Sequence, residues 1–343
     1  MLSLRWPRRT ALMATQGGFA ASVAAGLMGN YQVLLLSRMI SGVAYAGFFA
    51  IASVIAISLV TPDRNARASG VFVSGLSVAM VAGGPAGTLL SHFTQWRGGF
   101  WAVIALTLAG IIGCAIGIPT ANTDSRSPAR PSVSRELATL RTPRLWVIYG
   151  ITILTTTAYM ITFNYLSAML ADITGIPVIW IPAILTLFGI GAFIGLSIGG
   201  RISDRSPHVA LLSGAVAIVI LSVTMVIAIH DAWAVIPTVF LLGIAAFVLN
   251  PAIYGRVFAI AGDAPTLAGA TTVSAFQLGI SCTPVLAAAA LTQGTALTWV
   301  SLIGAILAAI AVPLILVDRT GLEGDATPDE TTTARTTIPR NPQ

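Results

Sequence analysis

Long apolar runs separated by short polar segments dominate the chain. They lie at residues 11–28, 33–60, 70–90, 100–119, 145–169, 180–199, 209–229, 234–255, 266–291 and 299–317. Most exceed the ~18 residues that distinguish a membrane-spanning helix from a buried helix of a soluble protein. A helix satisfies its own backbone hydrogen bonds in lipid, whereas a lone strand cannot. The pattern therefore predicts an all-α integral membrane protein with about ten transmembrane helices.

The composition excludes several other classes of protein. Hydrophobic residues make up 56% of the 343 residues and charged residues only 9%, whereas soluble domains carry about 25% charged residues. A soluble enzyme, a disordered protein and a nucleic-acid binder are excluded. The two cysteines, Cys114 and Cys282, lie in apolar runs, so we expect neither a disulfide framework nor a metal site.

The arginines predict the orientation in the membrane. All eighteen basic residues are Arg. If the N-terminus lies in the cytoplasm and the spans alternate, sixteen of them fall on cytoplasmic segments, Arg97 falls on an outer loop and Arg38 lies inside a span. Cytoplasmic loops carry an excess of positive charge. We therefore expect a multi-pass protein of the cell membrane with both termini in the cytoplasm.

The chain also contains an internal repeat at an offset of 199 residues. The segment RWPRR (5–9) falls on DRSPH (204–208), and Pro85 falls on Pro284. Each block holds four spans, and two further spans precede only the second block. We therefore expect an N-terminal half at 1–119 with four spans, a cytoplasmic linker at 120–144, a C-terminal half of six spans at 145–317 and a disordered cytoplasmic tail at 318–343. This 4 + 6 pattern equals six plus six spans with the first two, about 60 residues, absent.

Several motifs, in order, then resemble one family. GGRISDR (199–205) is similar to the Gly-x-x-x-Asp-Arg loop of the major facilitator superfamily, although Pro207 and His208 follow where Gly and a basic residue are usual. SRMISGVAYAG (37–47) resembles the Arg-x-x-x-Gly motif of the fourth span, and GGPAG (83–87) with WRGGF (96–100) resembles the antiporter motif of the fifth. FNYLSAMLADITG (163–175) and SAFQLGISCTP (274–284) resemble the seventh and eleventh spans. Within the family, the likeness is to twelve-span drug:proton antiporters of the chloramphenicol-efflux and arabinose-efflux type.

The resemblance implies a set of residues for coupling and gating. They are Arg38 and Gly42 of the fourth-span motif, Gly83, Pro85 and Gly87 of the fifth, and Gly200, Asp204 and Arg205 of the loop. Other interpretations stay open for each group. Arg38 lies about five residues, ~7 Å of helix rise, from the outer loop and could extend its side chain to the headgroups. The loop could be a plain solvated turn, and the glycines could serve generic helix packing.

A transporter of this kind holds its substrate near the middle of the membrane, between its halves. Polar or aromatic groups within the spans are the candidates for substrate binding: Tyr45, Tyr159, Asn164, Asn250 and Gln277. Phe163 and Phe276 would add apolar surface. Each polar group could instead form an interhelical hydrogen bond, worth about 0.6 kcal/mol.

The resemblance predicts a secondary active transporter that exports small amphipathic drugs, such as phenicols, or sugar-like compounds by alternating access. Its partners would be a small-molecule substrate, protons and the lipid bilayer, and we expect a monomer without cofactor, metal, catalytic residue or enzymatic activity. No Asp or Glu lies within a predicted span, so no coupling acid is assigned. The alternative is a non-transporting remnant from a truncated or mis-started gene. In-frame DNA upstream that encodes two more spans would exclude it.

Overall fold

The computed structural model of this protein describes residues 8–58, 65–117, 140–261, 265–292, 294 and 296–325. Every regular element in these ranges is a helix. The elements are α1 (Arg8–Met28), α2 (Tyr31–Ser58), α3 (Asn65–Gly117), α5 (Pro143–Asp172), the short 3-10 helix η4 (Val178–Trp180), α6 (Ile181–Arg205), α7 (Pro207–Ala228), α8 (Ala232–Ala261), α9 (Pro265–Leu291) and α10 (Trp299–Asp325).

The described helices match the predicted spans. Nine stretches within the described ranges are long and apolar enough to cross a membrane, and each contains or overlaps one of the predicted runs. The remaining run, 70–90, lies in the first part of α3, where most side chains fall outside the described residues. The predicted all-α membrane fold is therefore confirmed.

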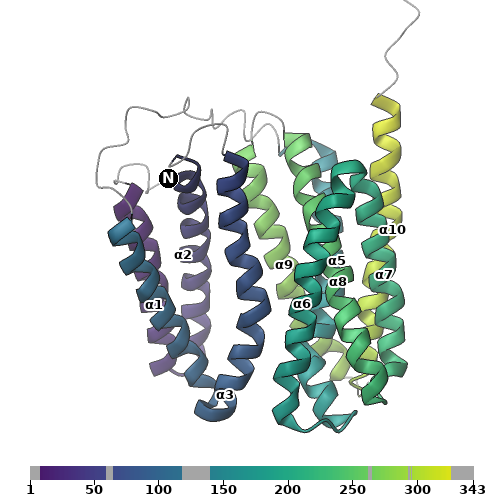
Figure 1. Cartoon of the computed structure of the whole chain (residues 1–343), viewed down its shortest axis with the longest axis horizontal. Coiled ribbons are helices and arrows are strands. Elements are labelled where there is room, and N and C mark those ends of the chain that lie inside the picture. Colours follow the sequence, from purple (N-terminus) through teal and green to yellow (C-terminus); the bar gives the residue numbers. More distant parts are fainter. Residues whose placement is uncertain are drawn as a thin grey trace, which may run out of the picture.

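The long helix α3 consists of two antiparallel limbs joined by a sharp bend. At Gln95 the backbone leaves helical geometry, with φ 59° and ψ −178°. This bend separates the predicted spans 70–90 and 100–119, and Figure 1 shows the chain turning back on itself beneath the α3 label. The polar segment between the two apolar runs is thus a tight connection rather than a loop.

The helices form two groups, which Figure 1 shows side by side. Helices α1, α2 and α3 pack against one another, and α5 to α10 form the second group. Among the described residues, α3 against α6 is the most extensive contact between the groups. The second group contains the large hydrophobic core, with Ile148, Leu166, Met169 and Leu211 fully shielded from the surroundings. This arrangement leaves a seam between two bundles.

Glycines bring α6 and α8 into close contact. Cβ atoms added at Gly191, Gly195 and Gly199 of α6 would lie 2.3 to 2.4 Å from carbonyl oxygens of α8. Their spacing of four residues places them on one face of the helix. Small residues at such positions allow membrane helices to approach with their backbones almost touching. The α6–α8 contact is therefore the tightest helix crossing that glycines create in the described chain.

Several helices continue beyond the predicted spans. α6 ends at Arg205 rather than near residue 199, α8 ends at Ala261 rather than near 255, and α10 continues to Asp325 rather than ending near 317. The tail predicted to start at 318 thus begins as helix. Residues 118–139 of the predicted linker and 326–343 of the tail lie outside the described residues.

Candidate functional site

The predicted Gly-x-x-x-Asp-Arg loop is the end of a helix. Gly200, Asp204 and Arg205 all lie in α6, and only Ser206 separates α6 from α7. The residue before a proline avoids helical geometry, which explains why Ser206, before Pro207, has φ −156° and ψ 89°. The prediction of a charged turn is therefore corrected to a helix end followed by a one-residue break.

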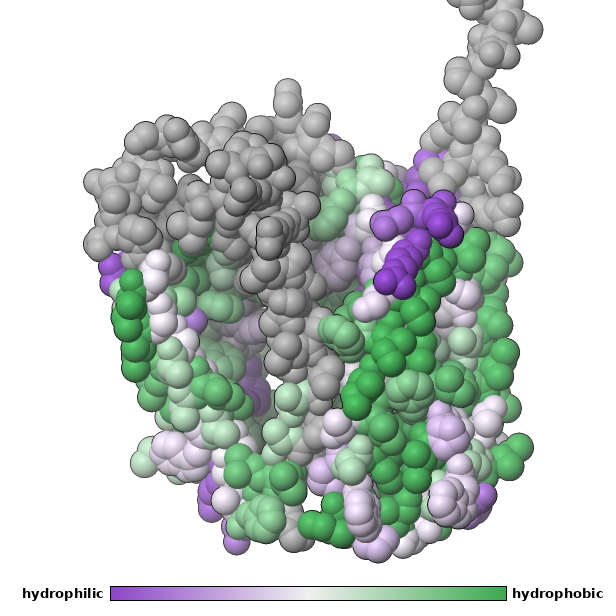
Figure 2. All heavy atoms as spheres, in the orientation of Figure 1, coloured by the Kyte–Doolittle hydropathy of each residue, from purple (hydrophilic) through white to green (hydrophobic). Residues whose placement is uncertain are grey.

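The charged side chains of this segment face the surroundings. Asp204 and Arg205 are exposed, and Figure 2 shows hydrophilic residues gathered at the end of the molecule where α6 meets α7. The segment is thus accessible to other charged groups at this end of the bundle. Its role in gating stays a prediction.

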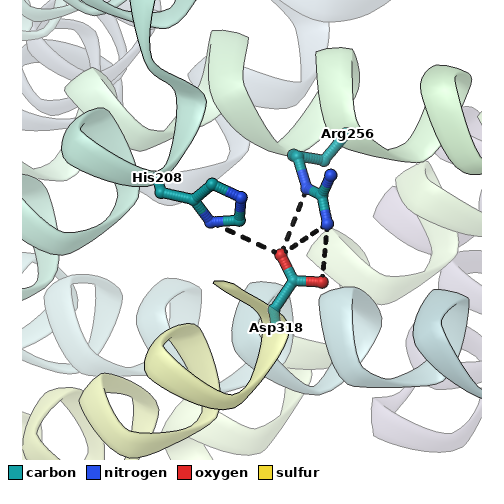
Figure 3. A network of polar contacts seen from close by, with 3 residues as sticks. All are labelled: His208, Arg256 and Asp318. Carbon is teal, nitrogen blue, oxygen red and sulfur yellow. Dashed lines mark hydrogen bonds and ion pairs between the residues drawn. The ribbon is translucent and has the colours of Figure 1, made fainter. Parts of the chain in front are cut away.

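A buried ionic network lies at the same end of the second helix group (Figure 3). Arg256 of α8 donates from Nε to Asp318 Oδ2 of α10 over 3.1 Å and from Nη2 to Asp318 Oδ1 over 2.7 Å. Arg256 is 6% exposed and Asp318 5%. His208, at the start of α7, brings Nδ1 within 3.7 Å of Asp318 Oδ2. The three side chains thus connect the ends of α7, α8 and α10.

Sequence analysis missed this network. It placed Arg256 in a cytoplasmic connection and Asp318 at the start of the tail, because both residues follow apolar runs that were taken to end before them. The structure places both inside helices. Apolar residues that continue after Arg256, in the segment VFAIA (257–261), are the signal that the helix extends further. Their pairing across 62 positions leaves no local trace in the sequence.

Arg38 has a partner that the sequence did not reveal. Its guanidinium carbon lies 4.8 Å from the centre of the Phe100 ring, on the second limb of α3. A cation over an aromatic face is attracted by about 0.5–1 kcal/mol when exposed. The Arg38 side chain is exposed to the surroundings of the protein. It therefore links α2 to α3, and neither gating nor extension to the headgroups is settled by this contact.

The other predicted gating residues show no close packing. A Cβ added at Gly42, Gly83 or Gly87 would meet no described heavy atom within 4 Å. Pro85 lies in the first limb of α3, and its side chain is outside the described residues. The close helix approach predicted for the segment around residues 83–87 is thus found in α6 instead. Any hinge role of these glycines rests on backbone freedom, not on contact.

The five predicted substrate-binding residues lie in different environments. Tyr159 is 4% exposed and packs in the core with its ring centre 5.6 Å from that of Phe247. Asn164 is exposed and donates to Thr283 over 3.4 Å. Gln277 is exposed on α9, and Tyr45 and Asn250 are half-buried on α2 and α8. The core position of Tyr159 suits packing rather than contact with a substrate.

The structure brings one of the five close to an unpredicted tyrosine. Tyr45 of α2 and Tyr254 of α8 lie near enough for the charge of one hydroxyl to act on the other. Asn250 precedes Tyr254 by one turn of α8. Tyr45, Asn250 and Tyr254 are therefore a candidate site at the seam between the two helix groups.

Comparison with known proteins decides the family. A family model described as Major Facilitator Superfamily matches residues 1–284. The chain belongs to the Major Facilitator Superfamily. Its resemblance to that family, inferred from the motifs, is confirmed, and so is the predicted class of function, membrane transport. The superfamily is one of transporters rather than of enzymes.

Individual relatives agree with this assignment. The chain is 34% identical over 332 residues to a protein named chloramphenicol resistance protein from Streptomyces lividans, covering 95% of this chain and 84% of that protein. It is 28% identical over 311 residues to the inner membrane transport protein YdhP of Escherichia coli K12, covering 90% and 79%. Among solved structures, the E. coli fucose:proton symporter FucP superposes with a TM-score of 0.61 at 15% identity, over 92% of this chain and 85% of that one. The likeness to FucP concerns the fold.

Proposed function

We propose that this Major Facilitator Superfamily transporter exports small amphipathic drugs of the phenicol class in exchange for protons. The observation that carries the proposal is the 34% identity, over 95% of the chain, to a protein named for chloramphenicol resistance. Two packed helix groups with a seam between them support transport by alternating access, since rocking of one group against the other exposes the seam to each side in turn.

The distribution of charge supports an orientation for this transport. The ends of α6 and of the α6–α7 break carry Arg201 and Arg205, whereas the bend of α3, which carries Arg97, lies at the opposite end. Positive residues favour the cytoplasmic side. We infer that the α6–α7 end faces the cytoplasm, with both chain termini on that side, in the cell membrane.

The exposed helix end of α6 would regulate the transition between the two states. Asp204 and Arg205 project from the last turn of α6, the helix that contacts α3 of the other group. Ionic contacts between α6 and the other group would stabilise one state and break when the groups separate. Arg38 would serve the same transition from α2, through its contact with Phe100.

A resistance assay tests the proposal. Expression of the chain in a drug-sensitive bacterium should raise the minimum inhibitory concentration of chloramphenicol at least fourfold. Asp204→Ala should abolish the gain at equal membrane levels, whereas Asp172→Ala, an exposed aspartate at the other end of the bundle, should retain it. Unchanged sensitivity with a protein that reaches the membrane would contradict the proposal.

A further inference from the structure

We propose that Tyr45, Tyr254 and Phe276 form a binding site for the aromatic ring of the transported molecule, with Asn250 as its polar partner. The inference rests on the proposed function and specifies the substrate class: planar aromatic compounds that carry hydroxyl or amide groups. Tyr254 is the central residue of this site, and no motif in the sequence points to it.

The first support is the stacking of the rings. The Tyr254 ring lies 5.7 Å from that of Phe276, centre to centre, with an angle of 29° between the ring planes. On its own helix, Tyr254 stacks on Phe258 at 6.3 Å and 27°. Offset-stacked rings at such distances attract one another. The stack therefore fixes the orientation of the Tyr254 ring and joins α8 to α9.

The second support is the position of the stack at the seam. Tyr45 comes from α2 in the first helix group, whereas Tyr254 comes from α8 in the second, and their hydroxyls interact electrostatically. Tyr45 in turn lies 6.2 Å from the ring of Phe49. Aromatic rings thus meet the seam from both groups. Transporters bind their substrates at this kind of position, where a molecule contacts both halves at once.

The third support is partial exposure combined with polar groups. Tyr45, Tyr254 and Phe276 are all half-buried, unlike Tyr159, Phe188 and Phe247, which are buried in the core of the second group. Asn250 lies on the same face of α8 as Tyr254, one turn earlier. Ligand sites typically combine apolar, aromatic walls with a few fixed polar groups. Two phenol hydroxyls and one amide provide such groups here.

These features select a chemistry. Stacking on Tyr254 and Phe276 requires a flat ring, and the hydroxyls and the amide would bind oxygen or nitrogen substituents on that ring or its side chain. A phenicol, with its nitrophenyl ring, hydroxyls and amide, has both. A sugar lacks the aromatic ring, so it would leave the stack without a partner.

Equilibrium binding to the purified full chain in lipid nanodiscs tests the site, with radiolabelled chloramphenicol as the probe. Tyr254→Leu removes the ring and should raise the Kd about tenfold. Tyr254→Phe keeps the ring and loses only the hydroxyl, so its Kd should rise by no more than about threefold. Phe193→Leu is the matched control, because Phe193 is 57% exposed on α6, and its Kd should match that of the wild type. Equimolar arabinose should not compete.

The possible outcomes separate this site from the proposed function. Equal Kd values for the wild type and Tyr254→Leu would overturn the aromatic site and leave phenicol export in place. Absence of chloramphenicol binding by the wild type would overturn both. If Tyr254→Leu fails to fold, Tyr45→Leu on the opposite helix group decides, since the site predicts the same tenfold loss there. Loss of binding in Phe193→Leu as well would attribute the effect to general packing and overturn the assignment.

Discussion

The Arg256–Asp318 pair shows how a charge is kept inside this bundle. Asp318 accepts from two nitrogens of the guanidinium, so that each charge satisfies the other and the pair stays neutral as a unit. Burial of an unpaired charge in such a place costs several kcal/mol. A bidentate contact is therefore a condition for Arg256 to lie within α8, and it explains why α10 remains helical past residue 317.

Removal of one member of this pair should destabilise the protein strongly. Asp318→Asn leaves Arg256 buried without its counter-charge, and the expected loss is about 3–5 kcal/mol of unfolding free energy. Denaturant unfolding in mixed micelles, followed by circular dichroism, measures it. Asp204→Asn is the matched control, because Asp204 is exposed, and its effect should stay within about 0.5 kcal/mol. Equal effects of the two changes would show that the pair does not stabilise the fold.

Two arginines that stack on aromatic rings should differ in function. Arg38 contacts Phe100 on another limb, whereas Arg97 lies 4.9 Å from the ring of its neighbour Trp96. If Arg38 takes part in the transition between states, Arg38→Ala should abolish chloramphenicol resistance, and Arg97→Ala should preserve it. Inhibitory concentrations at matched membrane levels provide the comparison. Retention of resistance in both variants would remove Arg38 from the mechanism.

At the scale of the element, the α6–α8 crossing depends on the absence of side chains. A Cβ at Gly195 would lie 2.4 Å from the carbonyl oxygen of Ile244, whereas a Cβ at Gly200, on the same helix, would meet no described atom within 4 Å. The same substitution at these two positions therefore separates helix packing from intrinsic helix propensity.

Gly195→Ala should lower the unfolding free energy by about 1–3 kcal/mol, because the two backbones must move apart. Gly200→Ala should leave it unchanged or raise it by roughly 0.5–1 kcal/mol, since alanine favours the helix. Denaturant unfolding of both variants in the same micelles measures the difference. A stabilising effect of Gly195→Ala would contradict the close crossing.

The bend of α3 predicts an opposite pair of effects. Gln95 has a positive φ with an extended ψ, a region that only glycine adopts without strain. Gln95→Gly should therefore raise the midpoint of thermal unfolding, by about 1–3 kcal/mol in free energy. Gln277→Gly, in the interior of α9, should lower it by about 1 kcal/mol. A lower midpoint for both variants would argue against the bend at residue 95.

Hydrophobic patterning was sufficient to predict most of the elements but not their contacts. Long apolar runs identify spans because lipid requires them, and the polar residues near 95 indicate the bend. The ends of α6 and α8 were placed too early, since arginines there were read as loop residues. Close packing was assigned to Gly83 and Gly87, whereas the structure shows it at Gly195; a glycine motif does not reveal which helix lies opposite. Tyr254 was missed because stacking with Phe276 depends on how α8 and α9 pack.

At the scale of the whole molecule, the account makes a claim about direction. The Arg-rich ends of the helices share one side of the bundle, and transport in the export direction requires that side to face the cytoplasm. Cysteine introduced at position 206, in the α6–α7 break, should react with a membrane-impermeant maleimide in inside-out vesicles only. Cysteine at position 231, beyond the other end of α7, should react in intact cells after outer-membrane permeabilisation. The reverse pattern would invert the topology.

Chloramphenicol uptake by proteoliposomes tests the central claim of proton-driven drug export most directly. With the chain reconstituted, an acidic lumen and a neutral exterior, protons leaving the lumen should drive the drug inward against its own gradient. We predict accumulation above the external concentration that collapses when an uncoupler dissipates the proton gradient, and that is absent from protein-free liposomes. Uptake that reaches only the external concentration, or that is the same with and without the proton gradient, would contradict the account.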